Sequence, residues 1–259
     1  MLLLSDISFE YSATAAQQTV GVLQNVSLSI PSGAIASIAG PSGCGKTTLL
    51  NVVAGILQPT AGTLVCPELI VNGKRRVGYV FQTPSLIPWR SIRENALLGA
   101  EIASARTDEL AKTCEELLSA YGLCGFQGAF PTSVSTGMQQ RVSMIRAALS
   151  GAKVILLDEP FSNSDFVVRR ELQRDLFRLV QERQLTAVVV THDIEEAVRI
   201  GDTVIVLTPR PAQVAAVIRV DIARDERFSN DCEVLRHLAN CTEEVEKAFV
   251  RACSEGSRP

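Results

Sequence analysis

The chain has 259 residues, 46% of them hydrophobic, and a formal net charge of −3. This length accommodates one large α/β domain with a buried core, and the apolar content argues against disorder. A slightly acidic chain offers no positive field for phosphate backbones, so nucleic acid is not an expected partner.

The first clear pattern in chain order is an alternation of apolar residues with serines over 26–30, which is followed by Pro31-Ser-Gly33. This pattern predicts a half-buried strand that ends in a turn, so we expect an antiparallel β edge to open the fold. Residues 34–39 then form a short apolar run that ends at Gly40. It predicts a buried strand, followed by a glycine-rich loop and a helix from Thr47 to about Ile56.

Between residues 91 and 150 the apolar spacing becomes helical, which predicts a helical subdomain at about 90–150 inserted in the core. Two apolar faces carry this prediction: Leu110, Cys114, Leu117, Leu118 and Tyr121 on one, and Val142, Ile145 and Leu149 on the other.

Residues 154–157 and 186–191 predict two strands joined by a helix, a β-α-β unit that implies a parallel sheet. Two further strands are expected at 204–207 and 214–220. A helical tail is predicted from about Asp231, so the expected division is a domain at 1–230 and a tail at 231–259.

The seven cysteines form no C-x-x-C pair, which predicts neither a disulfide framework nor a zinc site and favours a reducing cytosol. The first ten residues lack the basic start of a secretory signal. No apolar stretch reaches the roughly 18 to 20 residues that cross a bilayer. Any membrane role is therefore expected to be peripheral.

Residues 40–47 match the phosphate-loop pattern G-x-x-x-x-G-K-[ST] between a predicted strand and a predicted helix. The glycines let the backbone curl so that its N–H groups face a phosphate, Lys46 would reach the β- and γ-phosphates, and the Thr47 hydroxyl would bind Mg²⁺. The alternative is a glycine-rich turn that only connects two elements. The residues predicted to contact ATP here are Gly40, Pro41, Ser42, Gly43, Cys44, Gly45, Lys46, Thr47 and Thr48.

Cys44 stands inside this loop, at the start of a helix, where a thiol pKa tends to fall and reactivity to rise. A small space-filling side chain is the other interpretation. Alkylation of a reactive Cys44 would block nucleotide binding.

The strand at 154–157 leads into Asp158 and Glu159, at the end of a parallel sheet where ligands gather. Asp158 is the expected Mg²⁺ partner and Glu159 the group that orients or deprotonates the attacking water. Two solvated acids at a strand exit are the alternative. His192 ends a second strand and would contact the γ-phosphate, although a lone histidine is often structural.

Three more segments resemble motifs of the ABC ATPases, a branch of the P-loop NTPases. Residues 134–141 (VSTGMQQR) resemble the signature motif LSGGQ, Gln82 resembles the Q-loop glutamine, and residues 162–165 resemble the D-loop. His192 matches the switch histidine of that family, and the resemblance runs from about Leu3 to Val220. The expected fold is therefore an α/β P-loop NTPase with a parallel-sheet core, an N-terminal antiparallel edge and an inserted helical subdomain.

The resemblance implies a homodimer, or a pair with another ABC subunit, in which ATP lies between the phosphate loop of one chain and the signature of the other. Ser135 and the Gly137 amide, at a helix start, would close on the γ-phosphate; a plain N-cap is the bland alternative. Tyr11 resembles the aromatic residue that stacks on adenine, or it is a core aromatic. Glu159, His192 and Gln82 are the implied catalytic residues, with Thr47, Gln82 and Asp158 at Mg²⁺.

Residues 82–95 resemble the segment through which importer ATPases contact a permease, and the apolar stretch Leu86–Trp89 is either a docking surface or buried under the helical insertion. The sequence of this stretch resembles that of the ATPases of nitrate, sulfonate and taurine importers. The resemblance thus implies a subunit on the cytoplasmic face of the membrane, working with a permease and indirectly with a solute-binding protein. Alternatives are a non-transport ABC ATPase in DNA maintenance or translation, a regulator without turnover, and a small-molecule kinase.

Three positions depart from the family pattern: Val134, Thr136 and Ser164. All three fall where the resemblance places the dimer interface. Thr136 puts a β-branched side chain where a glycine would let the backbone approach the nucleotide, which is expected to slow turnover.

Overall fold

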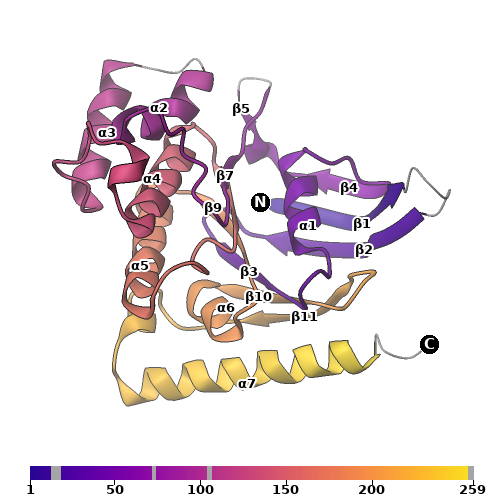
Figure 1. Cartoon of the computed structure of the whole chain (residues 1–259). Helices are drawn as coiled ribbons and strands as arrows, with labels where there is room; N and C mark the ends of the chain where they lie inside the picture. Colours follow the sequence, from indigo (N-terminus) through magenta and orange to yellow (C-terminus); the bar gives the residue numbers. More distant parts are fainter. Residues whose placement is uncertain (13–18, 72–73, 104–106, 256–259) are drawn as a thin grey trace. The chain divides into compact units, whose positions relative to one another are not determined.

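The structure is a computed structural model that describes residues 1–12, 19–71, 74–103 and 107–255 (Figure 1). The chain forms two compact units: Met1–Pro67 with Val188–Pro259, and Glu68–Ala187. Among the described residues, no helix combines the length and the apolar character that a membrane crossing requires.

The first unit opens with an antiparallel sheet, which confirms the predicted edge. Its central strand, β1, pairs with β2 at Leu4↔Leu28 and with β4 at Leu4↔Leu64. β2 is longer than the predicted 26–30, because residues before Val26 continue the pairing. The three strands are β1 (Leu2–Ser12), β2 (Thr19–Ile30) and β4 (Ala61–Val65).

The predicted apolar runs form strands in the order β11-β10-β3-β9, of which β3, β9 and β10 are largely buried. β10 pairs in parallel with β3 and antiparallel with β11, so the sheet is mixed at this edge. Buried parallel strands are apolar on both faces, which is why residues 35–39 show no alternation. The strands are β3 (Ile35–Ala39), β9 (Thr186–Thr191), β10 (Thr203–Leu207) and β11 (Val214–Arg219).

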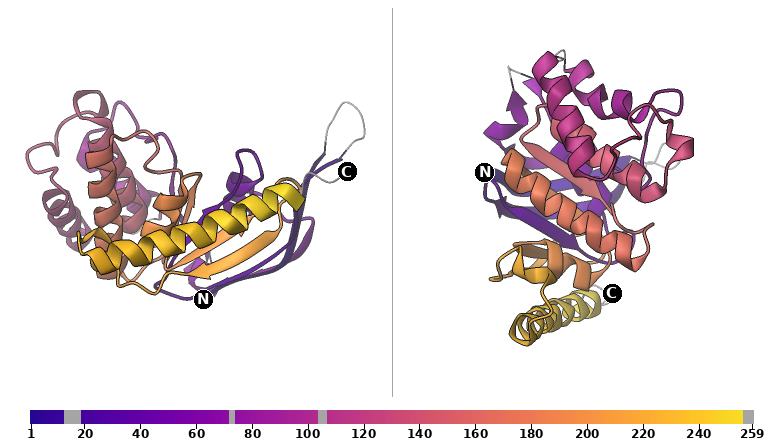
Figure 2. Two further views of the ribbon diagram at one scale, coloured as in Figure 1. Left: turned by 90° about the horizontal axis from the view of Figure 1, so that it is seen from below. Right: turned by 90° about the vertical axis from the view of Figure 1, so that its left-hand side faces the viewer.

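Three α-helices lie among the described residues of this unit. α1 (Lys46–Ala54) ends before Gly55, which takes a left-handed conformation with φ 77°. α6 (Ile194–Ile200), which the sequence did not predict, is capped by Asp193. The predicted tail is α7 (Cys232–Glu255), which runs along β11 and packs on α6, β10 and β11 through an apolar stripe that includes Leu238 and Val245 (Figures 1 and 2).

The second unit contains the predicted helical subdomain, which Figure 2 shows as a cluster of α2, α3 and α4. On the predicted faces Cys114, Leu117, Val142 and Ile145 are buried. β7 and β8 pair in parallel, and a β5–β6 hairpin precedes them. The elements are β5 (Ile70–Val71), β6 (Lys74–Arg75), β7 (Gly78–Val80), α2 (Ile92–Ile102), α3 (Asp108–Ala120), α4 (Thr136–Leu149), β8 (Val154–Asp158) and α5 (Phe166–Arg183). The three short 3-10 turns of the described chain are η1 (Pro67–Leu69), η2 (Pro131–Ser133) and η3 (Glu226–Phe228). The division at 230/231 stays a prediction, although α7 belongs to the first compact unit.

A buried arginine attaches the segment before α7 to the sheet of the first unit. Arg227 is 1% exposed and donates to the carbonyls of Gly201 at 3.0 Å and Ile222 at 3.0 Å, and to Asp202 Oδ1 at 3.0 Å. Asp202 also accepts from the Ile35 amide at 2.9 Å and from Arg224. Burial raises the pKa of the Asp202 carboxyl, but these donors outweigh it and leave the pKa below its ordinary value.

We expect Arg227→Ala to lower the free energy of unfolding by about 3–5 kcal/mol, because it breaks a buried charge pair and leaves buried carbonyls without a donor. Thermal and urea unfolding followed by circular dichroism measure the loss. Arg236→Ala, at an exposed position of α7, is the control and should leave the midpoint in place. A loss in Arg227→Ala no larger than in this control would contradict the anchoring role.

Candidate functional site

The phosphate loop connects β3 to α1, and its glycines are required by close packing. Gly45 has φ 127°, and a Cβ there would lie 2.8 Å from Val22 Cγ1 on β2. Gly43 also has a positive φ of 73°. α1 begins directly afterwards, with Leu49 N donating to Gly45 O at 2.9 Å. Only glycine fits position 45 without moving β2, so the loop is held in one shape.

Lys46 is buried, and its ammonium group lies within the loop. Its Nζ donates to Gly40 O at 2.8 Å and to Pro41 O at 3.0 Å. The free amides of the first turn of α1 and the positive end of the helix lie beside this charge. This arrangement has the features of a helix start that can hold a phosphate, and phosphate binding by these residues stays a prediction.

Tyr11 lies beside this helix and is not a core residue. Its ring is 45% exposed, and its hydroxyl is 3.4 Å from Thr48 Oγ1. Phe9 packs edge-on against it with ring centroids 4.8 Å apart. The interpretation of Tyr11 as a core aromatic is therefore wrong, and an exposed ring next to the phosphate loop agrees with a role in stacking.

Cys44 is 2% exposed, and burial raises the pKa of its thiol above the ordinary value, although Lys46 and Arg210 counteract part of this effect. The prediction of a reactive thiol with a lowered pKa is therefore wrong, because burial outweighs the helix start and the nearby cations. Cys44 fills space against Gly40, whose Cβ, if present, would lie 3.0 Å from the Cys44 sulfur.

The acidic strand end and the Q-loop glutamine meet in the second unit. Gln82 Nε2 donates to Glu159 Oε2 at 3.3 Å and to Ser162 Oγ at 3.2 Å. Ser162 Oγ in turn donates to Glu159 O at 3.0 Å. Glu159 follows Asp158, the last residue of β8, and has φ 45°, a rare conformation for a residue with a side chain that is often found at functional sites. Sequence reasoning missed Ser162 as the partner of Gln82.

His192 is exposed directly after β9, in the first unit. The chain around it is fixed locally: Asp193 N donates to Thr191 Oγ1 at 3.1 Å, and Asp193 Oδ1 accepts from Glu196 N at 3.0 Å. Tyr11, residues 40–48 and His192 thus belong to the first unit. Gln82, Ser135, Gly137, Asp158 and Glu159 belong to the second.

Ser135 caps α4, accepting from Met138 N at 3.3 Å, so the N-cap interpretation of the signature stretch is confirmed. A Cβ at Gly137 would lie 2.7 Å from Val168 Cγ1 on α5, which explains the glycine. Ser135 and Thr136 are exposed. Their contact with a nucleotide stays a prediction.

Asn95 on α2 holds the loop after Gln82 through hydrogen bonds to its main chain. Sequence reasoning missed this role of Asn95. Asn95 is fully buried; its Nδ2 donates to Ile87 O and Arg90 O, both at 3.0 Å, and its Oδ1 accepts from Ile87 N at 2.7 Å. Trp89, at the tip, is 77% exposed. The alternative prediction, that this stretch is buried under the helical insertion, is therefore wrong for Trp89.

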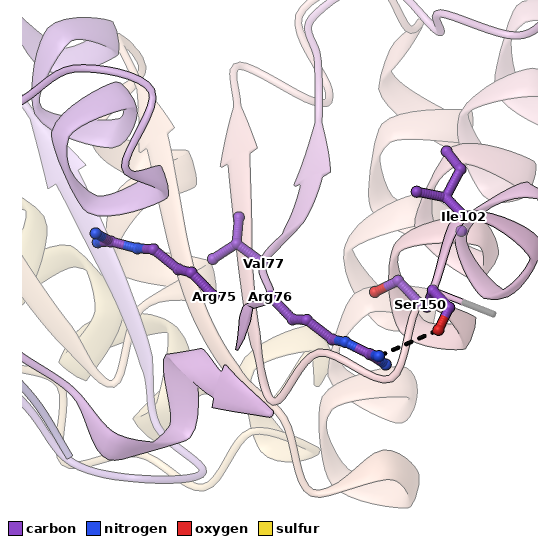
Figure 3. A pocket seen from close by; sticks show the side chains of 7 residues that line it. Arg75, Arg76, Val77, Ile102 and Ser150 are labelled. Carbon is purple, nitrogen blue, oxygen red and sulfur yellow. Dashed lines mark hydrogen bonds between the residues drawn. The ribbon is translucent and has the colours of Figure 1, made fainter. Parts of the chain in front are cut away.

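A cavity of about 420 Å³ in the second unit lies apart from these motif residues. Figure 3 shows Arg76 extending toward Ser150 while Arg75 points away from it. Arg76 donates to Ala103 O at 3.1 Å, so it satisfies a carbonyl at the end of α2, where a basic side chain is favoured. The cavity contains none of the residues predicted to bind ATP. Its lining is Arg75, Arg76, Val77, Gly99, Ile102, Ala103 and Ser150.

Comparison with known proteins gives one consistent family. A sequence model of the family described as "ABC transporter" matches residues 23–162. The taurine import ATP-binding protein TauB of Roseobacter denitrificans is 39% identical over 224 residues, which span 84% of this chain and 82% of that protein. The aliphatic sulfonates import ATP-binding protein SsuB 2 of Burkholderia cenocepacia is 38% identical over 204 residues, or 78% and 74% of the two chains. Among solved structures, the dimeric post-hydrolysis state of the ATP-binding cassette MJ0796 bound to ADP and Pi aligns with a TM-score of 0.70 at 28% identity, covering 86% of this chain and 100% of that chain.

We expect a thiol reagent applied to the native protein to label the exposed Cys124 and Cys232 first and Cys44 slowly, because Cys44 is buried and its thiol pKa is raised. Mass spectrometry of peptides after timed labelling gives the order, and labelling in denaturant is the control in which all seven cysteines react. Cys44 labelled as fast as Cys124 would contradict this order.

Proposed function

Because the chain belongs to the ABC transporter family, we propose that it is the ATP-binding and ATP-hydrolysing subunit of an importer, acting as one of a pair on the cytoplasmic face of a membrane. The observation that carries the proposal is the phosphate loop with its buried Lys46, in a chain 38–39% identical to proteins named as import ATP-binding subunits. The importer names favour transport over the non-transport alternative.

The first unit would hold the nucleotide. The amides of residues 43–48 and the Lys46 ammonium would surround the β- and γ-phosphates, with Lys46 exchanging its bonds to Gly40 O and Pro41 O for phosphate oxygens. The exposed Tyr11 ring would stack on the adenine.

Three oxygen donors suit Mg²⁺, which prefers carboxylate, hydroxyl and carbonyl oxygens: the Thr47 hydroxyl, the Asp158 carboxylate and the Gln82 amide oxygen. Gln82 fits this role because its Nε2 donates to Glu159 and Ser162, which turns Oε1 away from them. The ion, when bound, would offset negative charge on the β- and γ-phosphates as the γ-phosphoryl group leaves.

Glu159 would accept a proton from, or orient, the water that attacks the γ-phosphate. Its hydrogen bond with Gln82 orients the carboxylate, and Ser162 supports the same arrangement. His192, exposed at the end of β9, would hold the γ-phosphate and the water from a second direction.

A second copy would supply Ser135 and the Gly137 amide, at the start of α4, to the γ-phosphate bound by the first. The dimeric solved structure of the cassette MJ0796 supports such a pair. The exposed Trp89 and the loop held by Asn95 would contact a separate permease. Names of relatives support a small sulfonate such as taurine as the cargo, delivered to the permease by a solute-binding protein.

The decisive experiment compares Lys46→Ala and Glu159→Gln with the unmodified protein. Lys46→Ala should abolish MgATP binding, because the buried cation of the phosphate loop is lost. Glu159→Gln should bind MgATP with unchanged affinity but lose at least about 100-fold in hydrolysis rate, the loss expected when a general base is removed.

Binding is measured with a fluorescent ATP analogue and turnover by phosphate release. Glu195→Gln, an exposed acid on α6, serves as the control and should behave as the unmodified protein. Hydrolysis that survives in Lys46→Ala would overturn the proposed site.

A second prediction concerns the signature. Thr136→Gly should raise the ATPase rate about threefold, because it removes a β-branched side chain where the partner's nucleotide would approach the backbone. Steady-state phosphate release checks it, with Thr132→Ala, an exposed neighbouring threonine, as the control. An unchanged or lower rate would refute the steric explanation.

A further inference from the structure

The loop between β10 and β11 places a cationic side chain against the outside of the phosphate loop. Arg210 Nε donates to Gly43 O. Arg210 stands far from the loop in the sequence, and no motif in the chain predicted the contact. We propose that Arg210 is a positioning residue for nucleotide binding, which holds the Gly43–Cys44 peptide, and with it the curl of the phosphate loop, in the conformation that receives the phosphates; the proposal rests on the ATP site described above.

The geometry of one peptide bond supports this role. In a trans peptide the C=O and the N–H point in opposite directions, so a donor that fixes Gly43 O also fixes the direction of the Cys44 N–H. That N–H donates to Pro41 O at 3.2 Å, and Lys46 Nζ donates to the same oxygen at 3.0 Å. The Cys44 amide and the Lys46 ammonium thus converge on one acceptor inside the loop, while Arg210 holds the other side of the peptide.

Gly43 needs such a restraint more than another residue would. Its φ of 73° is a conformation that only glycine adopts readily, and glycine also leaves it readily. A Cβ at Gly43 would lie 3.8 Å from Arg210 Nη2, so the guanidinium lies alongside the residue without crowding it. The hydrogen bond from Arg210 therefore restricts a peptide whose glycine would otherwise allow it several conformations.

The segment that carries Arg210 is itself fixed to β2. Ala212 N donates to Val22 O at 2.8 Å, and Gln24 N donates to Ala212 O at 2.9 Å. Val22 is also the residue against which Gly45 packs. A single strand thus supports both ends of the arrangement, Gly45 directly and Gly43 through Arg210, so the distance between Arg210 and the loop is set by rigid structure.

The effect of the Arg210 charge on Cys44 also supports a position of Arg210 close to the phosphate loop. Burial is the main effect on the Cys44 thiol and raises its pKa, and Arg210 is one of two cations that oppose this effect, the other being Lys46. The guanidinium is exposed at the surface, where a positive charge would also favour the approach of a triphosphate.

The test uses the full chain with Arg210→Ala, Arg210→Lys and, as matched control, Arg219→Ala at an exposed position on β11. Arg210→Ala should raise the Kd for MgATP and the KM for hydrolysis about tenfold, the effect of losing one hydrogen bond to a charged donor, with kcat within about twofold. Arg210→Lys, which keeps a charged donor, should recover most of the affinity. Arg219→Ala should match the unmodified protein.

A purely structural role would give a different result, because a partly unfolded preparation loses active molecules and so lowers kcat while KM stays unchanged. That pattern, or a Kd for Arg210→Ala within twofold of the unmodified protein, would overturn the proposal. If the unmodified protein itself fails to bind MgATP, the proposed function fails instead, and the two failures are thereby told apart.

Discussion

The close approach of Gly45 to Val22 is the constraint on which the nucleotide site depends. A Cβ at position 45 would come within 2.8 Å of a side chain on β2, a contact that neither backbone could accept without shifting. The loop can therefore curl tightly enough for Lys46 to reach back to Gly40 O and Pro41 O. A preformed loop of this kind binds phosphate without first losing conformational entropy, which favours affinity.

The second unit uses side-chain amides for the same purpose. Asn95 holds the loop before α2 at Ile87 and Arg90, and Gln82 ties the end of β7 to Glu159 and Ser162. A buried amide carries both donors and an acceptor, so one side chain can satisfy several main-chain groups of an irregular loop. The chemistry-bearing residues thus stand on loops whose shapes are fixed by one or two side-chain amides, buried in the case of Asn95, rather than by regular pairing.

Much of this arrangement was predictable from the sequence, because it depends on local patterns. The apolar runs that became β3, β8, β9 and β10, the helical subdomain and the phosphate loop all follow from spacing that a short window reveals. The features that the sequence did not predict depend on contacts with residues that are distant in the sequence. β4 is mostly exposed and has a weak apolar pattern, so only its pairing with β1 identifies it. The choice between a reactive and a space-filling Cys44 also needed the fold, because the burial that raises the pKa of its thiol comes from tertiary packing. Arg210 and Asn95 carry no motif of their own, and their contacts appear only once the chain has folded.

Two of the three departures from the family pattern, Thr136 and Ser164, are compatible with the fold of their own unit. Thr136 is exposed in the first turn of α4, and no packing contact within its own unit requires the side chain to be small. Ser164 donates its amide to Phe161 O at 3.2 Å and accepts from Arg169 at 3.4 Å through its carbonyl, both main-chain contacts that most residues at this position would keep. By contrast, Gly137, which the chain retains, would clash with Val168 of the same unit if it carried a side chain. The glycine demanded by the fold of this unit is thus present, whereas Thr136 stands at an exposed position where the family pattern has a glycine. Thr136 and Ser164 are thus compatible with the fold of a single chain, and their effect on the pairing of two subunits stays a prediction.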